Sequence, residues 1–333
     1  MVNLVLRKGS NSQFQKSLQN NVIEWGTSLT IDQYFERERV LRNTPYSQQA
    51  HSFYVLVPED NLDTTDILAH CEVYEHPALL ALASGVPQDI KCMSIGSVFC
   101  PAEHRGKGYA RKMMSLLYEE LEENPEVHAS TLYSDIGPVF YDRIGWKTMS
   151  SKEVVIAVQP TWQVPTNIQP ITNKAEIDKL VTQDNILIHE EMLNQAQPAF
   201  CVLPTPEKIH WIQRRSQFYC EQLGHANIEI LGAHVPGTDS YVTYFHNFTE
   251  KSMYFLRMRS DSNQTTKAFI ALAQREALRY NFEKIILWDV PAMQGLGEQQ
   301  TIVEQREESI SALTVFNDIT NVSWLYNEKF AWV

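Results

Sequence analysis

The stretch from Cys92 to Leu121 constrains the fold of this 333-residue chain more than any other. It starts with an apolar run at Met93–Cys100, which is typical of a buried strand and which Pro101 ends, because proline has no ladder donor. From Ala110 onward, apolar residues recur at helical spacing and predict an amphipathic helix. A loop with two glycines joins the two elements. The sequence therefore predicts a strand, a glycine-bearing loop and a helix N-terminus in succession.

Such a corner suits an anion, because unpaired backbone N–H groups and the positive end of a helix dipole meet there. Gly106 and Gly108 have no Cβ atom, so the backbone can approach a phosphate or pyrophosphate closely. Basic side chains surround them in a chain with a net charge of −12: Arg105, Lys107, Arg111 and Lys112. The sequence has no G-x-x-x-x-G-K-[ST] motif and no third glycine at position 111, which disfavours nucleoside triphosphates and dinucleotides.

Two ordered motifs identify the ligand class. Residues 105–110 match [QR]-x-x-G-x-[GA], directly after a V-x-x-P strand end at 98–101. Residues 140–146 match [LF]-Y-x-x-x-G-[FW], with a strand-like segment at 128–133 between the motifs. The pair resembles the acetyl-CoA-binding elements of the GCN5-related N-acetyltransferases (GNAT), over about the first 160 residues. The sequence outside these two motifs, with YFERER at 34–39 and LYSDIG at 132–137, resembles the fungal lysine acetyltransferases of lysine degradation.

The resemblance implies where acetyl-CoA binds and which groups act on it. The N–H of Val98, at the splayed end of the central strand, would bond the thioester oxygen. Tyr141 would protonate the leaving thiolate, a role that suits a phenol with an ordinary pKa near 10; its alternative role is packing on the sheet. The family often has asparagine at position 134, where this chain has serine. The implied cofactor contacts are Val98, Phe99, Cys100, Arg105, Gly106, Lys107, Gly108, Tyr109, Ala110, Arg111 and Ser134.

The sequence leaves the proton acceptor open. Ser94 stands where some family members have a glutamate, so that role does not transfer. Glu72 and His70 share one face of a predicted strand at 67–74, and Glu72 is a candidate base. His70 is also expected to contact the acceptor, although both side chains suit ordinary polar positions in a sheet. A terminal carboxylate at Val333, buried by apolar neighbours, is a third candidate, and an ordered water is a fourth.

Two predicted helices, Phe14–Trp25 and Thr30–Arg42, wall the acceptor pocket in the resembled family. Arg37, Arg39 or Arg42 would then hold the carboxylate of an amino acid, which a guanidinium grips with two hydrogen bonds. The alternative is a solvated helix face with Glu–Arg ion pairs. We take Arg37 and Arg42 as the substrate-binding candidates.

The length suits two domains. Residues 1–158 are predicted to form a GNAT fold, and 159–170, with three prolines, to be the linker. Residues 171–333 are predicted to form a degenerate GNAT-like domain, and the whole chain is an α/β (α+β, mixed-sheet) protein. Its loop at 259–267 has no glycine and contains Asp261, so it should not bind coenzyme A. An unrelated α+β domain is the alternative.

The second-half prediction rests on an order of elements that repeats the first half. The expected elements are strands at 228–234, 241–246 and 253–259, a helix at 264–280, a strand at 284–290, a helix at 302–316 and a final strand-like segment at 324–333.

Composition limits the partners. The charge of −12 argues against nucleic acid and anionic membranes, and no apolar run has the length of a membrane span. The five cysteines lack metal-ligand spacing and indicate reduced thiols in a cytoplasmic protein without a metal. The expected function is acetyl transfer to a small-molecule amine, with free L-lysine favoured. A protein, peptide or polyamine acetyltransferase and a non-catalytic acyl-CoA sensor are the alternatives, and the oligomeric state is not indicated.

Overall fold

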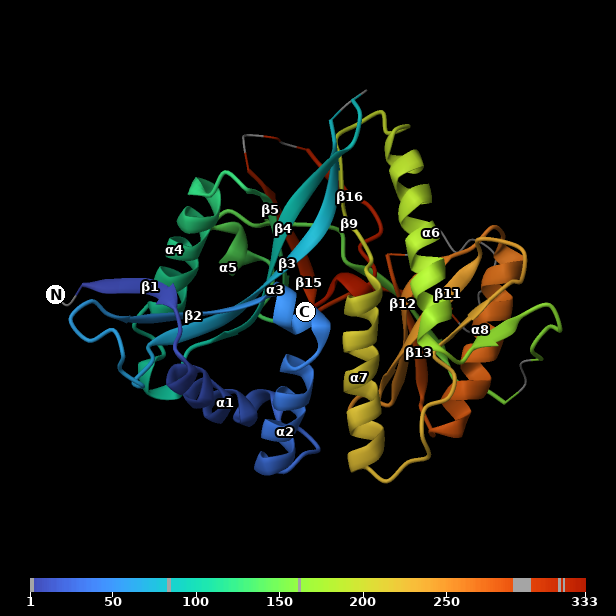
Figure 1. Cartoon of the computed structure of the whole chain (residues 1–333), viewed down its shortest axis with the longest axis horizontal. Coiled ribbons are helices and arrows are strands. Elements are labelled where there is room, and N and C mark those ends of the chain that lie inside the picture. Colours follow the sequence, from blue (N-terminus) through green and yellow to red (C-terminus); the bar gives the residue numbers. More distant parts are fainter. Residues whose placement is uncertain (1–2, 83–84, 161–162, 290–300, 317–318, 320) are drawn as a thin grey trace.

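Two mixed sheets with flanking helices lie side by side in the computed structural model, and the C-terminus lies between them (Figure 1). The structure describes residues 3–333 except 83–84, 161–162, 290–300, 317–318 and 320. This is the mixed α/β architecture that the sequence predicts. The strands of the first sheet are β1 (Leu4–Lys8), β2 (His51–Pro58), β3 (Ala69–Ala81), β4 (Gln88–Phe99), β5 (Val127–Ser134), β6 (Lys147–Thr148), β9 (Ala199–Val202), β15 (Ile310–Val315) and β16 (Ser323–Trp324).

The second sheet has the order β14-β7-β13-β12-β11-β10-β8. Its strands are β7 (Lys152–Ala157), β8 (Gln169–Ile171), β10 (Gly232–His234), β11 (Tyr241–Asn247), β12 (Ser252–Arg259), β13 (Lys284–Trp288) and β14 (Thr301–Gln305). The helices are α1 (Asn11–Trp25), α2 (Ile31–Arg42), α3 (Pro45–Ala50), α4 (Tyr109–Glu123), α5 (Val139–Asp142), α6 (Lys174–Met192), α7 (Pro206–Gln222) and α8 (Asn263–Arg279), with 3-10 turns η1 (Ala102–His104) and η2 (Lys329–Ala331).

Helices cover both faces of the first sheet because apolar side chains of its strands point alternately to one face and the other. Phe53, Val55 and Val57 of β2 pack with α1 and α2, whereas Tyr54 and Leu56 pack with α4 on the opposite face. The predicted helix after the glycine loop is confirmed, and it buries Met113, Met114, Leu117 and Leu121. The sequence offers Ser10 or Ser12 as the N-cap of the first helix and Thr30 as that of the second. The side chains of Ser10 and Thr30 accept hydrogen bonds from the third residue of α1 and α2, and each forms a capping box.

The central strands β4 and β5 run parallel and then separate. Their register runs from Lys91 opposite Val127 to Ile95 opposite Leu132 and ends there, so the last four residues of β4 have no partner on β5. On its other side β4 has a bulge, because His70 and Glu72 of β3 face Phe99 and Gly96. The divergence opens a gap at the C-terminal end of both strands.

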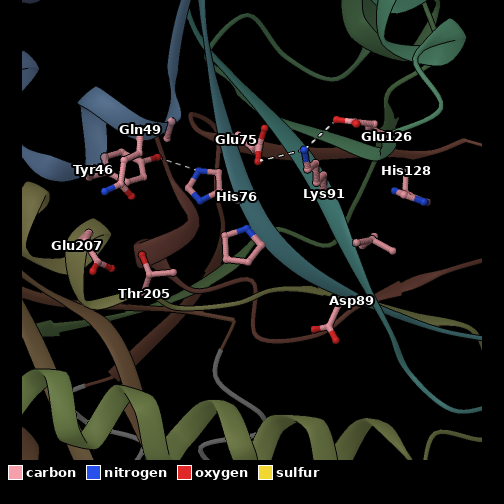
Figure 2. A pocket seen from close by; sticks show the side chains of 13 residues that line it. Tyr46, Gln49, Glu75, His76, Asp89, Lys91, Glu126, His128, Thr205 and Glu207 are labelled. Atoms are coloured by element: carbon pink, nitrogen blue, oxygen red, sulfur yellow. Dashed lines mark hydrogen bonds and ion pairs between the residues drawn. The ribbon is translucent and has the colours of Figure 1, made fainter.

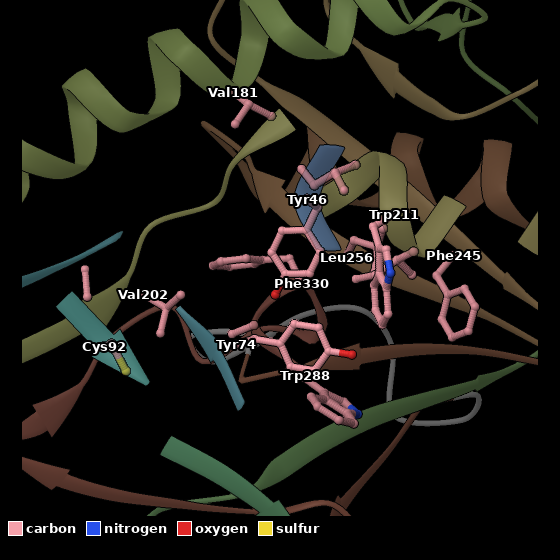
Figure 3. Packing of buried hydrophobic residues seen from close by; sticks show 14 of the residues in the cluster. Tyr46, Tyr74, Cys92, Val181, Val202, Trp211, Phe245, Leu256, Trp288 and Phe330 are labelled. Carbon is pink, nitrogen blue, oxygen red and sulfur yellow. The ribbon is translucent and has the colours of Figure 1, made fainter. Parts of the chain in front are cut away.

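The two halves of the chain exchange strands. β7 pairs with β13 and β14 in the second sheet, while β15 returns to the first sheet and pairs with β5 and β6. The predicted division at residues 159–170 therefore does not follow sheet membership, and it stays a prediction. Aromatic residues of both halves also share one core, in which Tyr46 and Tyr74 pack near Trp211 and Trp288 (Figure 3).

The prediction for the end of the chain is wrong in part. The expected helix at 302–316 is the pair of strands β14 and β15. β15 is buried along most of its length between β5 and β6, so its apolar residues serve both faces of a sheet rather than one helix stripe. The expected final strand is only β16 and the turn η2, and Val290 of the expected strand at 284–290 lies outside the described residues. The sequence also predicts a helix at 136–144, where the structure has only the single turn of α5.

Candidate active site

A cavity of about 500 Å³ occupies the gap where β4 and β5 separate. Several predicted cofactor contacts line it together: Val98, Phe99, Cys100 and Arg105. Tyr141 of α5 lines it from a second element, and Glu24 and Trp25 line it from the end of α1. The structure thus brings the strand end, the start of the glycine loop and the tyrosine to one place, as the sequence predicts.

The backbone around Val98 is set by the bulge in β4. Ser97 has a φ of 51°, which L-residues adopt rarely, and it turns the strand out of register with its neighbours. The segment Gly96–Phe99 lines the cavity beyond the point where pairing with β5 ends. Main-chain groups of this segment are therefore available to a ligand that enters between the strands.

The glycine loop ends in a helix without a side-chain cap. Gly108, with a φ of 82°, is the N-cap of α4, and no side chain accepts a hydrogen bond from the first-turn N–H groups there. Gly106 has a φ of 78°, and a Cβ atom at either glycine would meet nothing within 4 Å. The positive φ angles explain the glycines, and the open space beside them leaves room for an anion.

The basic side chains of the loop are held by nearby groups. Arg105 donates to the carbonyl oxygen of Cys100 at 3.0 Å and forms an ion pair with Glu24 at 3.0 Å. Lys107 donates to the carbonyl oxygen of Glu103 at 2.9 Å. Among the other predicted contacts, Tyr109 and Ala110 form the half-buried first turn of α4, and Arg111 is exposed.

Tyr141 is fixed by the motif that follows it. Its carbonyl oxygen accepts hydrogen bonds from the N–H groups of Gly145 and Trp146 at 3.1 and 3.2 Å. Gly145 has a φ of 150°, and a Cβ atom there would lie 2.2 Å from the ring of Tyr118. The indole of Trp146, fully buried, donates to the hydroxyl of Ser130 at 3.0 Å. These contacts explain the spacing of the motif.

The Tyr141 side chain is buried at the cavity wall, with an exposed fraction of 7%. Burial raises the pKa of its phenol, so the group carries its proton at neutral pH. Ser134 is placed differently from the other predicted contacts. Its hydroxyl donates to the carbonyl oxygen of Gly137 at 2.8 Å and accepts from the N–H of Ile136, so it shapes the turn before α5.

Glu72 is buried and already hydrogen-bonded. Its carboxylate accepts a hydrogen bond from the hydroxyl of Tyr74 at 2.7 Å and lies 2.9 Å from the ring nitrogen of His51. Burial alone would raise the pKa of Glu72, but the partners His51 and Tyr74 outweigh it and lower the pKa to about 2. A carboxylate with this pKa is a weak proton acceptor at neutral pH.

His70 lies in the core and not at the cavity. Its ring stacks on Phe99 at 5.4 Å between ring centres and packs against Phe53. Both ring nitrogens are buried without a hydrogen-bond partner among the described residues. Burial lowers its pKa to about 4, which keeps the imidazole neutral.

The two arginines of α2 have different surroundings. Arg37 is buried and saturated: it pairs with Glu38 and donates to the hydroxyl of Tyr219 on α7 at 2.6 Å. Arg37 therefore holds α2 against the second half of the chain. The guanidinium of Arg42 lies 3.6 Å from the ring of Phe14, and its buried Nη1 has no hydrogen-bond partner among the described residues.

The end of the sequence reaches the cavity strand. A Cβ atom built on Gly96 would lie 3.3 Å from the main-chain oxygen of Val333 and 3.4 Å from its carbonyl carbon. Gly96 is the residue opposite Glu72 in the ladder of β3 and β4. A glycine inside a predicted strand signals close approach of another group, and this signal was present in the sequence.

A larger cavity, of about 680 Å³, lies at the opposite end of β4 (Figure 2). Carboxylates dominate its charged lining, and Lys91 forms ion pairs there with Glu126 at 3.0 Å and Glu75 at 3.8 Å. His76 lies 3.0 Å from the hydroxyl of Tyr46 at its wall. None of the site residues predicted from the sequence lines this cavity.

The described residues contain no cluster of three or more histidine, cysteine, aspartate or glutamate side chains that could hold a metal ion. Within the same ranges, no helix combines the length and the apolar character that a membrane crossing requires.

The chain is similar in sequence to known acetyltransferases. Residues 154–333 match the family model described as the LYC1 GNAT-like C-terminal domain, and residues 77–149 match the acetyltransferase (GNAT) domain. A lysine acetyltransferase of Yarrowia lipolytica is 25% identical over 318 residues, which cover 80% of this chain and 79% of that protein.

Solved structures show the same fold over nearly the whole chain. A probable N-acyltransferase of Enterococcus faecalis superposes with a TM-score of 0.61 at 15% identity, covering 94% of this chain and 72% of that one. A GCN5-related N-acetyltransferase of Anabaena variabilis gives a TM-score of 0.58 at 14% identity, covering 95% and 73%. Both halves of the chain are therefore GNAT-like in fold, as the sequence predicts.

Proposed function

Because this chain belongs to the LYC1-like family of GNAT acetyltransferases, we propose that it transfers acetyl from acetyl-CoA to the side-chain amine of free L-lysine. One observation carries the proposal: the cavity between β4 and β5 joins a bulged strand end to Tyr141, beside the uncapped N-terminus of α4. The lysine acetyltransferase of Yarrowia lipolytica supports the choice of acceptor. The proposed cytoplasmic location follows from the sequence alone.

The residues present fit acetyl-CoA. Two glycines with positive φ and open space beside them precede the uncapped helix end, where N–H groups suit a pyrophosphate. The pantetheine arm would run along Phe99 and Cys100, and the N–H of Val98 would bond the thioester oxygen. Arg105 would exchange its partner Glu24 for a phosphate oxygen, which binds a guanidinium with two hydrogen bonds.

The reaction needs one proton donor and one proton acceptor. The amine nitrogen of the acceptor bonds to the carbonyl carbon, the carbon–sulfur bond breaks, and the leaving thiolate takes the proton of Tyr141. The new amide nitrogen then gives up its second proton, which returns to the phenolate and restores Tyr141. The buried phenol is a filled donor until that moment, because burial disfavours its ionised form. The ammonium must lose one proton before it attacks, and a general base takes that proton.

The candidates for the general base differ in how well the structure supports them. The low pKa of Glu72 weighs against it as the base. The hypothesis of a carboxylate at Val333 is supported by the contact of that residue with Gly96. Adding a single glycine after Val333 tests it, because the extension moves any terminal carboxylate away from Gly96. If turnover survives the extension, proton transfer through an ordered water would be the remaining candidate.

An acceptor panel tests the function. The protein is mixed with acetyl-CoA and L-lysine, a lysine-containing peptide or a polyamine, and released thiol is measured. We expect the highest kcat/KM with free L-lysine. A preference for the peptide or the polyamine would show that this molecule, and not free L-lysine, is the acceptor. Stabilisation by acetyl-CoA without thiol release from any amine would indicate a sensor.

A further inference from the structure

Three basic side chains lie between the two halves of the chain and take no part in the chemistry above. Lys208 and Arg215 are on α7, and Lys329 is on the turn η2. Positions 208, 211 and 215 follow the three- and four-residue spacing of one helix face, so Lys208, Trp211 and Arg215 point to the same side of α7. That side packs against α2, α3 and the last residues of the chain.

Aromatic rings surround these cations, while carboxylates, Glu250 for Lys329 and Glu38 for Arg215, act on them from beyond ion-pair distance. The Nζ of Lys208 lies 4.3 Å from the ring of Trp211 and 4.7 Å from that of Tyr46. The Nζ of Lys329 lies 4.0 Å from the ring of Trp288 and 4.2 Å from that of Trp332. Figure 3 shows how closely Tyr46, Trp211 and Trp288 gather in this part of the core.

The third cation completes the group. The guanidinium of Arg215 lies 5.6 Å from the ring of Trp332 and 6.0 Å from that of Tyr219. Within the described part of the chain, the side chains of Lys208, Arg215 and Lys329 form no ion pair or hydrogen bond, whereas the backbone N–H of Lys208 donates to the hydroxyl of Thr205. The Nζ of Lys208 is also fully buried without a partner there.

Unpaired cations in a protein interior are costly, because burial removes their hydration and nothing replaces it. The pKa values report this cost: burial, followed by the charges of Lys329 and Arg215, lowers the pKa of Lys208. Burial likewise lowers the pKa of Lys329 to about 7. A bound anion would relieve the cost by pairing with the group.

Two chains of residue contacts link the cluster to the acetyl-transfer cavity, although none of the three basic side chains lines that cavity itself. Trp332, which flanks both Arg215 and Lys329, is followed by Val333, which contacts Gly96 of β4. On the second route, Lys208 lies 5.8 Å from the ring of Tyr74, whose hydroxyl donates to Glu72, the residue paired with Gly96.

We propose that Arg215, Lys329 and Lys208 form the site that binds the carboxylate of the acceptor, so that the enzyme selects an amino acid over a simple amine. The inference rests on the proposed function and narrows its substrate class. Of the two arginines proposed from the sequence, Arg37 is already paired with Glu38 and Tyr219. Arg42 lies over the ring of Phe14 and has one buried nitrogen without a partner among the described residues, so it is the competing candidate for the same role.

Three small molecules separate the carboxylate from the amine. L-Lysine carries both groups, cadaverine is lysine without the carboxylate, and L-norleucine keeps the carboxylate but has no side-chain amine. Thiol release is measured with lysine and cadaverine, and calorimetric titration measures the binding of norleucine. The variants are Arg215→Gln and Lys329→Met. The control is Arg214→Gln, whose side chain pairs with Glu221 on the outer side of α7.

We expect the wild type to prefer lysine to cadaverine. Arg215→Gln and Lys329→Met should raise KM for lysine by about tenfold to a hundredfold, the equivalent of one charge-assisted hydrogen bond, and leave cadaverine unchanged. Norleucine should bind the wild type and the control but not these variants. Thermal stability should change little, because burial already disfavours the charge that each substitution removes.

Other outcomes overturn the carboxylate site. Equal losses with lysine and cadaverine would assign these residues a structural role, as would a fall in thermal stability. Norleucine binding that survives both substitutions would exclude the site directly. If no amine releases thiol, the proposed function fails, while the norleucine titration still decides whether the cations bind a carboxylate. Glycyl-lysine distinguishes a free amino acid from a peptide C-terminus.

Discussion

Glu72→Gln measures how much the buried carboxylate of Glu72 contributes to the free energy of unfolding. Folding lowers the pKa of Glu72 from 4.5 to about 2. At about 1.4 kcal/mol per unit, the ionised carboxylate stabilises the fold by about 3 kcal/mol at neutral pH. Because the folded-state pKa is depressed, this stabilisation is complete above the unfolded-state value and disappears as the pH falls through about 2.

The variant lacks the titrating group, so the difference between the two proteins should depend on pH. Urea unfolding followed by tryptophan fluorescence should give a gap of about 3 kcal/mol at pH 7 and about 1 kcal/mol at pH 3. Glu126→Gln is the matched control, because its carboxylate pairs with Lys91 on the surface. That control should change stability little at either pH.

A gap that stays constant with pH would show that the lost stability comes from packing, and that the hydrogen bonds from Tyr74 and His51 do not stabilise the ionised form. A gap that widens toward pH 3 would reverse the sign and refute the reasoning. Either result would return Glu72 to consideration as a proton acceptor with a pKa nearer neutrality.

Three further substitutions address the cavity. Tyr141→Phe should lower kcat by about 10²- to 10⁴-fold in the thiol assay and leave the thermal shift caused by acetyl-CoA in place; unchanged turnover would exclude the phenol as proton donor. Gly108→Val should abolish that thermal shift, since a β-branched residue does not suit a φ of 82° at the N-cap of α4, and a retained shift would place the cofactor elsewhere. Gly145→Ala, whose new Cβ atom would lie 2.2 Å from the ring of Tyr118, should lower Tm by several degrees; an unchanged Tm would mean that Tyr118 yields freely.

The features that could be predicted from the sequence are those that depend on residues close together in the chain. The strand, the glycine loop and helix α4 follow from periodicity and from Gly108, and the caps Ser10 and Thr30 follow from local hydrogen bonds. The placement of Tyr141 follows from the spacing to Gly145, where the packing against Tyr118 leaves no room for a side chain.

The rest depends on partners far along the chain. The partner that saturates Arg37 is Tyr219, 182 residues away, and no local pattern reveals it. The segment Ile310–Val315 has the apolar content of a buried helix, and only the gap left beside β5 makes it a strand. The unpaired state of the Lys208 ammonium is equally invisible in the sequence, because it depends on which of the described residues come close to it in three dimensions.

The strand exchange between the halves has a consequence for how the protein can be cut or made. A fragment that stops after residue 158 would lack β15, leaving β5 with an open edge, and it would expose β7 without its neighbours β13 and β14. The second half alone would lose the strand that joins β13 to β14. Neither piece is a self-sufficient module, so the interlocked halves should melt as one cooperative unit, and severed fragments should aggregate unless they are reunited.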